Sequence, residues 1–575
     1  MQRTQENYIT LSQKVRRLVC YCNRGSDSIQ ANPDNELFGK EKKDHYMSDS
    51  YHPIKVELYR NLFTSVDQEM GTVLRRTAFS PNIKERRDYS CALFDGQGEV
   101  VAMGDHMPVH LGSMPLSVRA VIEAYPLYPG DIVILNDPFS GGTHLPDITM
   151  VAPVYEPSDV SRPVSFVACR AHHSDVGGIT PGSMPLSRSI FQEGIRMPPL
   201  KLYERGELNQ DLLRFILYNV RTPIEREGDL AAQVGSLKVG EKRVLGLVKR
   251  NGRPEVETYM NALQSYGERV TKQLISEIPD GSYRAEDVLD DDGTEEESSK
   301  ARTIDIRVCI EVRGDQMRID FEGSHQQVPG CINAVKAITL SAVYYVLRCL
   351  LSDEAPTSAG LMRPVRVVTP VRSVVDAVYP AATAGGNVET SQRIVDVLLK
   401  ALHSALPEKI PAASSGTMNN LTLGGTDPTT GQAFSYYETI GGGMGASPQA
   451  NGDSGIHTHM SNTMNTPIEA LESCFPVRVR EYRLRRRSGG QGKFRGGDGI
   501  VRSLEMLTEC QVTVLSDRRR CPPYGLASGT PGKMGSNFVI IKGRRKKLPG
   551  KFSVSLSPGE IVRIETPGGG GWGRR

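Results

Sequence analysis

Histidine and aspartate side chains gather in one window of this 575-residue sequence, and both are types that bind metals. His144 and Asp147 stand three residues apart, with Pro146 between them to stiffen the backbone. His172 and His173 follow in a second polar stretch. Neutral imidazoles and ionised carboxylates that converge from rigid backbone favour Mn, Fe or Zn, whereas Mg and Ca prefer shells of oxygen alone. The pattern predicts a divalent metal site, although hydrogen-bonding residues that stabilise irregular loops would leave the same spacing.

Buried strands must position these side chains. Short apolar runs at 131–135, 150–154 and 163–170 predict three such strands. His172 and His173 follow the third strand, and successive side chains of a strand point to opposite faces. One of the two histidines should therefore face the site, and the other should point away from it.

His106 and His110 form another candidate pair, with the spacing that places two ligands on one face of a helix. Pro108 lies between them and disfavours a helix at that point. We therefore do not expect these two histidines to bind a metal together.

Helical and strand-like patterns are interleaved along the chain. They predict an α+β fold, large and mixed, with glycine-rich loops and a β-rich last third. Amphipathic or apolar spacing predicts helices at 54–78, 208–219, 229–276, 334–352 and 388–405. Besides the three strands above, hairpins are predicted for 90–94 with 100–103 and for 302–311 with 316–322.

The chain divides into an extension and one long folded region. Residues 1–50 are mixed and charged, and we interpret them as a variable, disordered extension. Region 51–573 comprises a part with the predicted metal site (51–200), a helical and mixed part (201–411) and a β-rich part (412–573).

Glycine is abundant, with 57 residues, and clusters at 385–387, 441–445 and 568–571. Such clusters can bring backbone N–H groups to an anion, but tight turns and close chain crossings are the favoured interpretation. No GxxxxGK[ST] phosphate loop occurs in the sequence. The glycines therefore do not by themselves predict a nucleotide site.

Six arginines form a basic run: Arg478, Arg480, Arg483, Arg485, Arg486 and Arg487. An anion or nucleic-acid patch is one interpretation, and a solvated strand face paired with neighbouring carboxylates is the favoured one. The whole chain has 69 Lys and Arg against 66 Asp and Glu, a net charge of +3. A dedicated nucleic-acid binder needs a larger surplus of positive charge, so no nucleic-acid partner is expected.

The sequence predicts neither membrane insertion nor secretion. No run approaches the ~18–20 apolar residues of a membrane span, and the first fifty residues lack the apolar core of a signal peptide. The ten cysteines include no CxxC pair, which favours reduced, buried thiols. We therefore expect a cytoplasmic protein.

Several long motifs resemble those of the hydantoinase B/5-oxoprolinase family. They are RRTAFS (75–80), ERRDYSCA (85–92), GGTHLPD (141–147), AHHSDVGG (171–178), PGSMP (181–185), QEG (192–194), GGNVET (385–390), TPIE (466–469) and TPGGGGWG (566–573). The resemblance extends over nearly all of 53–573 and excludes the N-terminal extension.

The resemblance implies a B-type subunit. In this family a B-type module works with an A-type module, an ATP-binding protein with an actin-like fold, on a separate or a fused chain. A separate A-type partner, and thus a hetero-oligomer, is implied here. The partner would use ATP to phosphorylate a cyclic amide such as 5-oxoproline or a hydantoin, and the B-type subunit would complete ring opening.

The resemblance also implies a ligand set. In related carboxylases the B-type subunit holds a metal with a histidine, an aspartate three residues later and a further histidine. These positions match His144, Asp147 and the pair His172 and His173. His172 is preferred, because several relatives carry an aromatic residue at the second place of the pair.

Further roles follow from the same resemblance. Asp175 or Asp137 is expected to orient a ligand imidazole, and Glu85, Asp88 and His110 are candidates for general acid–base catalysis.

Two features leave the substrate and the activity open. Cys331 stands where relatives often carry asparagine, which leaves the substrate class undecided. A subunit of an ATP-dependent ketone carboxylase is an alternative function. A scaffold for the A-type partner without catalysis of its own is another.

Overall fold

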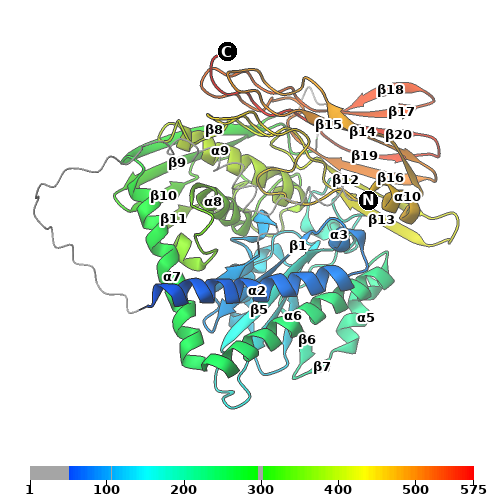
Figure 1. Ribbon diagram of the computed structural model, residues 1–575. Coiled ribbons are helices and arrows are strands. Elements are labelled where there is room, and N and C mark those ends of the chain that lie inside the picture. The colour runs from blue at the N-terminus through cyan, green and yellow to red at the C-terminus, as the bar shows by residue number, and fades with distance from the viewer. Residues whose placement is uncertain (1–50, 105–106, 295–301) are drawn as a thin grey trace, which may run out of the picture.

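Figure 1 shows the computed structural model of the chain, which describes residues 51–104, 107–294 and 302–575. The predicted extension 1–50 and His106 lie outside these residues. Within them, helices are interleaved with strands of four sheets, so the predicted α+β class and β-rich last third are confirmed. No helix in the described part of the chain is long and apolar enough to cross a membrane.

An antiparallel sheet of seven strands forms the core of the N-terminal part, in the order β2-β1-β5-β4-β3-β6-β7. Its strands are β1 (Tyr89–Asp95), β2 (Val100–Met103), β3 (Ile132–Leu135), β4 (Asp147–Val154), β5 (Ser165–His172), β6 (Leu200–Glu204) and β7 (Glu207–Leu208). Strands β1, β4 and β5 are buried throughout, because alternate side chains enter two separate cores. Leu93 enters one core, for example, and Phe94 the other.

Helices cover this sheet. α2 (Pro53–Thr77) and α6 (Pro223–Asn251) lie side by side along it, α2 over β1 and α6 over β4 and β5 (Figure 1). The other helices and turns of this part are α3 (Pro81–Lys84), η1 (Pro108–His110), α4 (Met114–Ala124), η2 (Pro138–Ser140), η3 (Ile190–Gln192), α5 (Gln210–Tyr218) and α7 (Arg253–Ser276). The single helix predicted at 229–276 was wrong in one respect: Gly252, with φ 80°, separates α6 from α7.

A second sheet, in the order β11-β10-β9-β8, packs against α9. Its elements and their neighbours are β8 (Gly281–Leu289), β9 (Ile304–Arg313), β10 (Gln316–Asp320), α8 (Lys336–Leu350), η4 (Ala359–Met362), β11 (Val365–Val368), the π-helical turn η5 (Gly386–Thr390) and α9 (Ser391–His403). The predicted β9–β10 hairpin is confirmed. The sequence missed β8, because its residues are mostly polar and partly exposed and give no apolar run.

Two antiparallel sheets form the C-terminal part, in the orders β13-β12-β16-β19 and β14-β15-β20-β17-β18. Apolar side chains from both sheets share one core, as Leu423 of β12 and Leu504 of β15 do. The elements are β12 (Asn420–Thr426), β13 (Ala433–Glu438), α10 (Ile468–Cys474), β14 (Val477–Arg485), β15 (Gly499–Met506), β16 (Cys510–Leu515), β17 (Ser536–Ile541), β18 (Arg544–Leu548), β19 (Lys551–Leu556) and β20 (Ile561–Glu565).

The C-terminal glycine clusters lie where backbone segments cross. A Cβ atom at Gly443 would stand 2.0 Å from the carbonyl oxygen of Gly497, and one at Gly569 would stand 2.0 Å from that of Met444. No side chain fits at such a distance, so glycine is required. The preferred interpretation of these clusters, close chain crossings, is confirmed.

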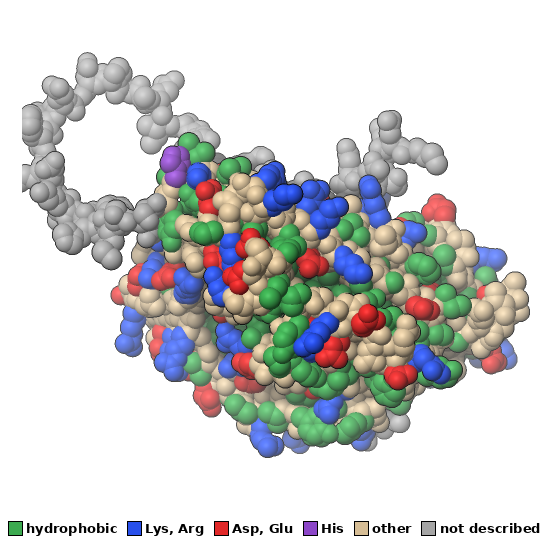
Figure 2. Space-filling view, turned by 90° about the horizontal axis from the view of Figure 1, so that it is seen from below, with side chains coloured by type: hydrophobic (Ala, Val, Ile, Leu, Met, Phe, Trp, Pro, Cys, Tyr) green, Lys and Arg blue, Asp and Glu red, His purple; other side chains and the backbone are tan. Residues whose placement is uncertain are grey.

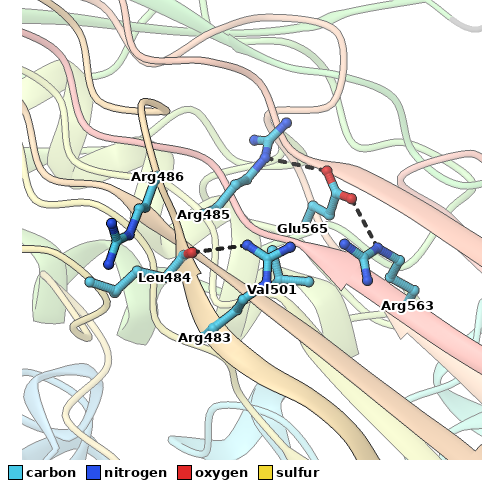
Figure 3. A pocket seen from close by; sticks show the side chains of 7 residues that line it. All are labelled: Arg483, Leu484, Arg485, Arg486, Val501, Arg563 and Glu565. Carbon is cyan, nitrogen blue, oxygen red and sulfur yellow. Dashed lines mark hydrogen bonds and ion pairs between the residues drawn. The ribbon is translucent and has the colours of Figure 1, made fainter.

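Arginines of β14 pair with carboxylates on the same sheet. Arg483 binds Glu481 at 2.5 Å, and Arg485 lies 3.4 Å from Glu565, which also binds Arg563 (Figure 3). The favoured interpretation of the basic run, a paired strand face, is confirmed for these residues. Elsewhere on the surface, Figure 2 shows basic and acidic side chains interspersed on the face that it views.

Candidate metal centre

Strand pairing brings Asp147 and His172 together. Asp147 begins β4, His172 ends β5, and the two are direct partners in the antiparallel register. His144 lies in the tight turn before β4, where its carbonyl accepts a hydrogen bond from the Asp147 N–H at 3.1 Å. Both strands extend beyond the apolar runs that predicted them, so these polar residues lie at strand ends.

Three ligand atoms converge between these side chains. His144 Nε2 lies 3.2 Å from Asp147 Oδ1 and 3.2 Å from His172 Nδ1, and the latter two atoms are 3.3 Å apart. Donor atoms around a tetrahedral ion with bonds of ~2.1 Å stand about 3.4 Å apart. The triangle of two nitrogens and one oxygen therefore fits a divalent metal ion, and in the described residues it is the only such group.

The charges of the three groups suit the same purpose. All three side chains are buried. Burial lowers the pKa of His172 to about 3, so its ring is neutral at pH 7. Burial alone would raise the pKa of Asp147, but His144 and His110 hold it well below its usual value. A neutral imidazole beside an ionised carboxylate is the form in which both residues bind metals.

His173 points away from this centre. Its Nε2 lies 2.9 Å from Oε1 of Gln233 on α6, on the opposite face of the sheet. Burial, with Arg226 nearby, lowers its pKa to about 4, so this ring is also neutral. The prediction that one histidine of the pair faces the site and the other points away is confirmed, and His172 is the one that faces it.

His110 and Thr143 contact the second oxygen of Asp147. Thr143 donates a hydrogen bond to Asp147 Oδ2 at 2.6 Å, and His110 Nε2 lies 3.4 Å from the same atom. The other ring nitrogen of His110, Nδ1, is 2.9 Å from the hydroxyl of Ser90. His110 thus lies beside the candidate metal ligands, and its Nε2 has no hydrogen-bond partner among the described residues.

The other two candidates for acid–base catalysis differ in position. The backbone carbonyl of Asp88 accepts a hydrogen bond from the His172 N–H at 3.0 Å. Burial raises the pKa of the Asp88 carboxyl to about 7, although Arg86 opposes the shift. Glu85 is half-buried at the end of α3, and its carboxylate makes no hydrogen bond or ion pair within the described residues. The structure brings Asp88 to the centre and shows no contact that links Glu85 to it.

The two aspartates expected to orient a ligand imidazole are bound elsewhere. Asp175 forms an ion pair with Arg221 at 2.9 Å. Asp137 accepts hydrogen bonds from the Phe139 N–H and the Ser140 hydroxyl, and so caps η2. Both carboxylates stabilise loops around the centre, and neither contacts the ring of His144 or His172 in the described structure.

Two residues at the centre were not assigned a role from the sequence. The ring of Tyr437, on β13, stacks on that of His172 with centroids 4.4 Å apart and planes 17° apart. The amide of Asn387, on η5, lies 3.0 Å from His144 Nε2. Asn387 belongs to the GGNVET motif, which was the available signal, whereas nothing in the sequence around Tyr437 distinguishes it. The centre thus draws on all three parts of the chain.

Comparisons with known proteins agree with these motifs. The family model described as hydantoinase B/oxoprolinase matches residues 52–575. The chain is 38% identical to 5-oxoprolinase 1 of Arabidopsis thaliana over 90% of its own length and 42% of that protein. It is 28% identical to a Pseudomonas protein named as the B-type component of a D-/L-hydantoinase, over 91% and 90% of the two chains.

A solved structure shares the fold. The ATP-dependent caprolactamase from Pseudomonas jessenii superposes with a TM-score of 0.83 at 29% identity, covering 92% of both chains. The present chain spans about two fifths of the length of the 5-oxoprolinase and nearly all of the hydantoinase component. Together with the family match over residues 52–575, these likenesses show that the chain belongs to the hydantoinase B/oxoprolinase family.

Proposed function

We propose that this chain is the B-type subunit of an ATP-dependent cyclic amide hydrolase of the 5-oxoprolinase or N-methylhydantoinase type. Ring opening is completed at the centre formed by His144, Asp147 and His172. The observation that supports this most directly is the convergence of two nitrogens and one carboxylate oxygen within 4.8 Å in a buried site. Family membership supports the substrate class.

In this proposal ATP is bound by a separate A-type partner, which phosphorylates the substrate. Two observations support it. The chain contains no GxxxxGK[ST] loop. It also matches the hydantoinase component over 90% of that protein, but the 5-oxoprolinase over only 42%.

The side chains at the centre divide the work. A divalent metal, bound by His144, Asp147 and His172, supplies a Lewis acid and a water of lowered pKa. Thr143 fixes the orientation of the Asp147 carboxylate by its hydrogen bond. Ring opening removes a proton from water and delivers one to the ring nitrogen, and the buried, unpartnered Nε2 of His110 is placed to carry it.

The test is reconstitution with the A-type partner. ATP turnover and product are measured with 5-oxoproline, hydantoins and ketones, with and without bicarbonate. We expect ring-opened product from a cyclic amide without bicarbonate. In His144→Ala the product should fall at least about 100-fold, at or beyond the upper end of the loss on removing an outer-sphere partner of a metal, while ATP hydrolysis continues.

His325→Ala is the matched control. His325 is exposed, and its ring contacts only the carbonyl of Gln326 among the described residues, so both activities should be unchanged. Wild-type product formation in His144→Ala would refute the role of the centre. Product that forms only from ketones with bicarbonate would identify a carboxylase instead.

A further inference from the structure

Asn387 reaches into the candidate metal centre from a distant part of the chain. Its amide nitrogen Nδ2 is placed 3.0 Å from His144 Nε2, the atom that also faces Asp147 Oδ1 and His172 Nδ1. The side chain is buried, and its oxygen Oδ1 has no hydrogen-bond partner among the described residues. A buried amide oxygen without a partner costs about 1–3 kcal/mol, so its position calls for a ligand.

The backbone around Asn387 is held rigidly from two sides. The carboxylate of Glu193 accepts hydrogen bonds from the N–H groups of Thr383 and Ala384, at 2.8 and 3.0 Å. The carbonyl of Cys331 accepts bonds from the N–H groups of the two glycines that precede Asn387, at 2.9 and 3.1 Å. Asn387 is therefore fixed in position before any metal binds, as a ligand needs to be.

The buried Cys331 belongs to this support. Its backbone carbonyl anchors the start of η5, and burial raises the pKa of its thiol to about 12, so the thiol remains protonated. Cys331 thus acts on the centre through the backbone that carries Asn387.

The orientation of the amide decides what it can do. The two ends of an asparagine amide have almost the same shape, and their assignment depends on the neighbouring groups. An N–H donor suits a bare imidazole nitrogen, but it cannot face a cation. A half-turn about the last side-chain bond exchanges Nδ2 for Oδ1 without moving the backbone, and a carbonyl oxygen is a metal ligand.

We propose that Asn387 is a fourth protein ligand of the metal centre, binding through its amide oxygen. The inference rests on the proposed metal centre and deepens it. Four protein donors would complete a tetrahedral shell, and a catalytic metal needs an open position. The set of two histidines, one aspartate and one asparagine therefore fits an ion that takes five or six ligands, such as Mn²⁺ or Fe²⁺.

The test measures metal binding without substrate. Protein freed of metal by a chelator is titrated with Mn²⁺, followed by the resonance of free Mn²⁺, and with Co²⁺, followed by visible absorption. Asn387→Leu should weaken Mn²⁺ binding at least about 10-fold and shift the Co²⁺ bands, because one oxygen donor is lost. Asn387→Asp should bind Mn²⁺ more tightly than wild type, because a carboxylate replaces a neutral amide.

Gln392→Leu is the matched control. Gln392 is a buried amide on α9 that donates to the carbonyl of Thr458, away from the three ligand atoms. It should match wild type in Mn²⁺ affinity while losing similar thermal stability. Circular dichroism establishes that each variant is folded, and Asn387→Asp provides the test if Asn387→Leu is not.

The outcomes separate the two proposals. If wild-type protein binds neither ion, the metal centre and the role of Asn387 both fail. If wild type binds Mn²⁺ and Asn387→Leu binds it equally well with unshifted Co²⁺ bands, only the role of Asn387 fails. Unchanged Mn²⁺ affinity in Asn387→Asp also counts against it.

Discussion

At the scale of single residues, neighbours in the sequence have opposite environments. His172 and His173 are adjacent and both buried, yet one faces Asp147 and the other faces Gln233 across the sheet. Successive side chains of a strand alternate between its faces, and β5 ends between two separate cores. The same residue type is therefore a candidate ligand on one face and a structural hydrogen-bonding group on the other.

Substitution separates these two roles. His172→Ala should lose the metal, because a ligand atom is removed. His173→Leu should retain it but lower the free energy of unfolding by about 1–3 kcal/mol, because the Gln233 oxygen loses its buried partner. Elemental analysis and denaturant titration measure the two effects. Equal metal loss in both variants would contradict the assignment.

At the scale of elements, a π-helical turn presents Asn387 to the centre. η5 precedes α9 and packs directly on the turn that contains Cys331 and Asn333. Gly386 makes this contact possible, since a Cβ atom there would stand 2.0 Å from the carbonyl oxygen of Asn333. Single π turns inside helices occur frequently at functional sites.

Gly386→Ala should displace η5. The added methyl group meets backbone that cannot rotate away, so we expect a loss of about 1–3 kcal/mol in unfolding free energy together with weaker Mn²⁺ binding. Thermal unfolding and Mn²⁺ titration provide the measurements.

Gly246→Ala is its control. Gly246 lies inside α6 with open space around its Cβ position, so alanine should stabilise the protein by about 0.5–1 kcal/mol. Similar effects of the two substitutions would show that close contact at Gly386 is unimportant.

At the scale of the whole molecule, buried ion pairs join parts far apart in the sequence. Arg393 of α9 binds Asp396 at 2.9 Å and Asp517, just after β16, at 3.0 Å. All three side chains are fully buried. Arg518 adds a bond to Asp396 at 2.7 Å and binds Asp287 of β8. The middle and C-terminal parts are thereby linked by charges that have no access to water.

Arg393→Met should destabilise the protein strongly. It leaves Asp517 without its guanidinium partner in a buried site, which costs about 3–5 kcal/mol. The control is Arg119→Met, which removes an exposed pair with Glu99 and should cost no more than about 1 kcal/mol. Denaturant titrations of the two variants compare these losses, and similar small losses would contradict the prediction.

Metal removal should be felt across the molecule. The centre joins strand ends of the seven-stranded sheet to η5, so an ion that binds only the folded chain stabilises all of these parts together. At a free metal concentration 100 times the dissociation constant, the gain is about 2.7 kcal/mol. Calorimetry with and without chelator should show a lower Tm after removal, whereas an unchanged Tm would argue against a structural contribution of the metal.

The sequence by itself determined the elements and the local pieces of the site. Apolar spacing predicted α2, the β1–β2 hairpin and the strands of the candidate centre, because burial imposes a period of 3.6 residues on helices and two on strands. The proximity of His144 to Asp147 followed from their spacing, and strand alternation predicted that only one histidine of the pair 172–173 would join them.

Only the tertiary structure decided how these pieces meet. It placed Asn387 beside His144 across 243 residues, stacked Tyr437 on His172, and paired Asp175 and Asp137 with loop groups. Long-range contacts of this kind leave no periodic trace in the sequence, because they depend on how sheets and helices pack in three dimensions. Local pattern fixes which side chains are available, and packing decides which of them face one another.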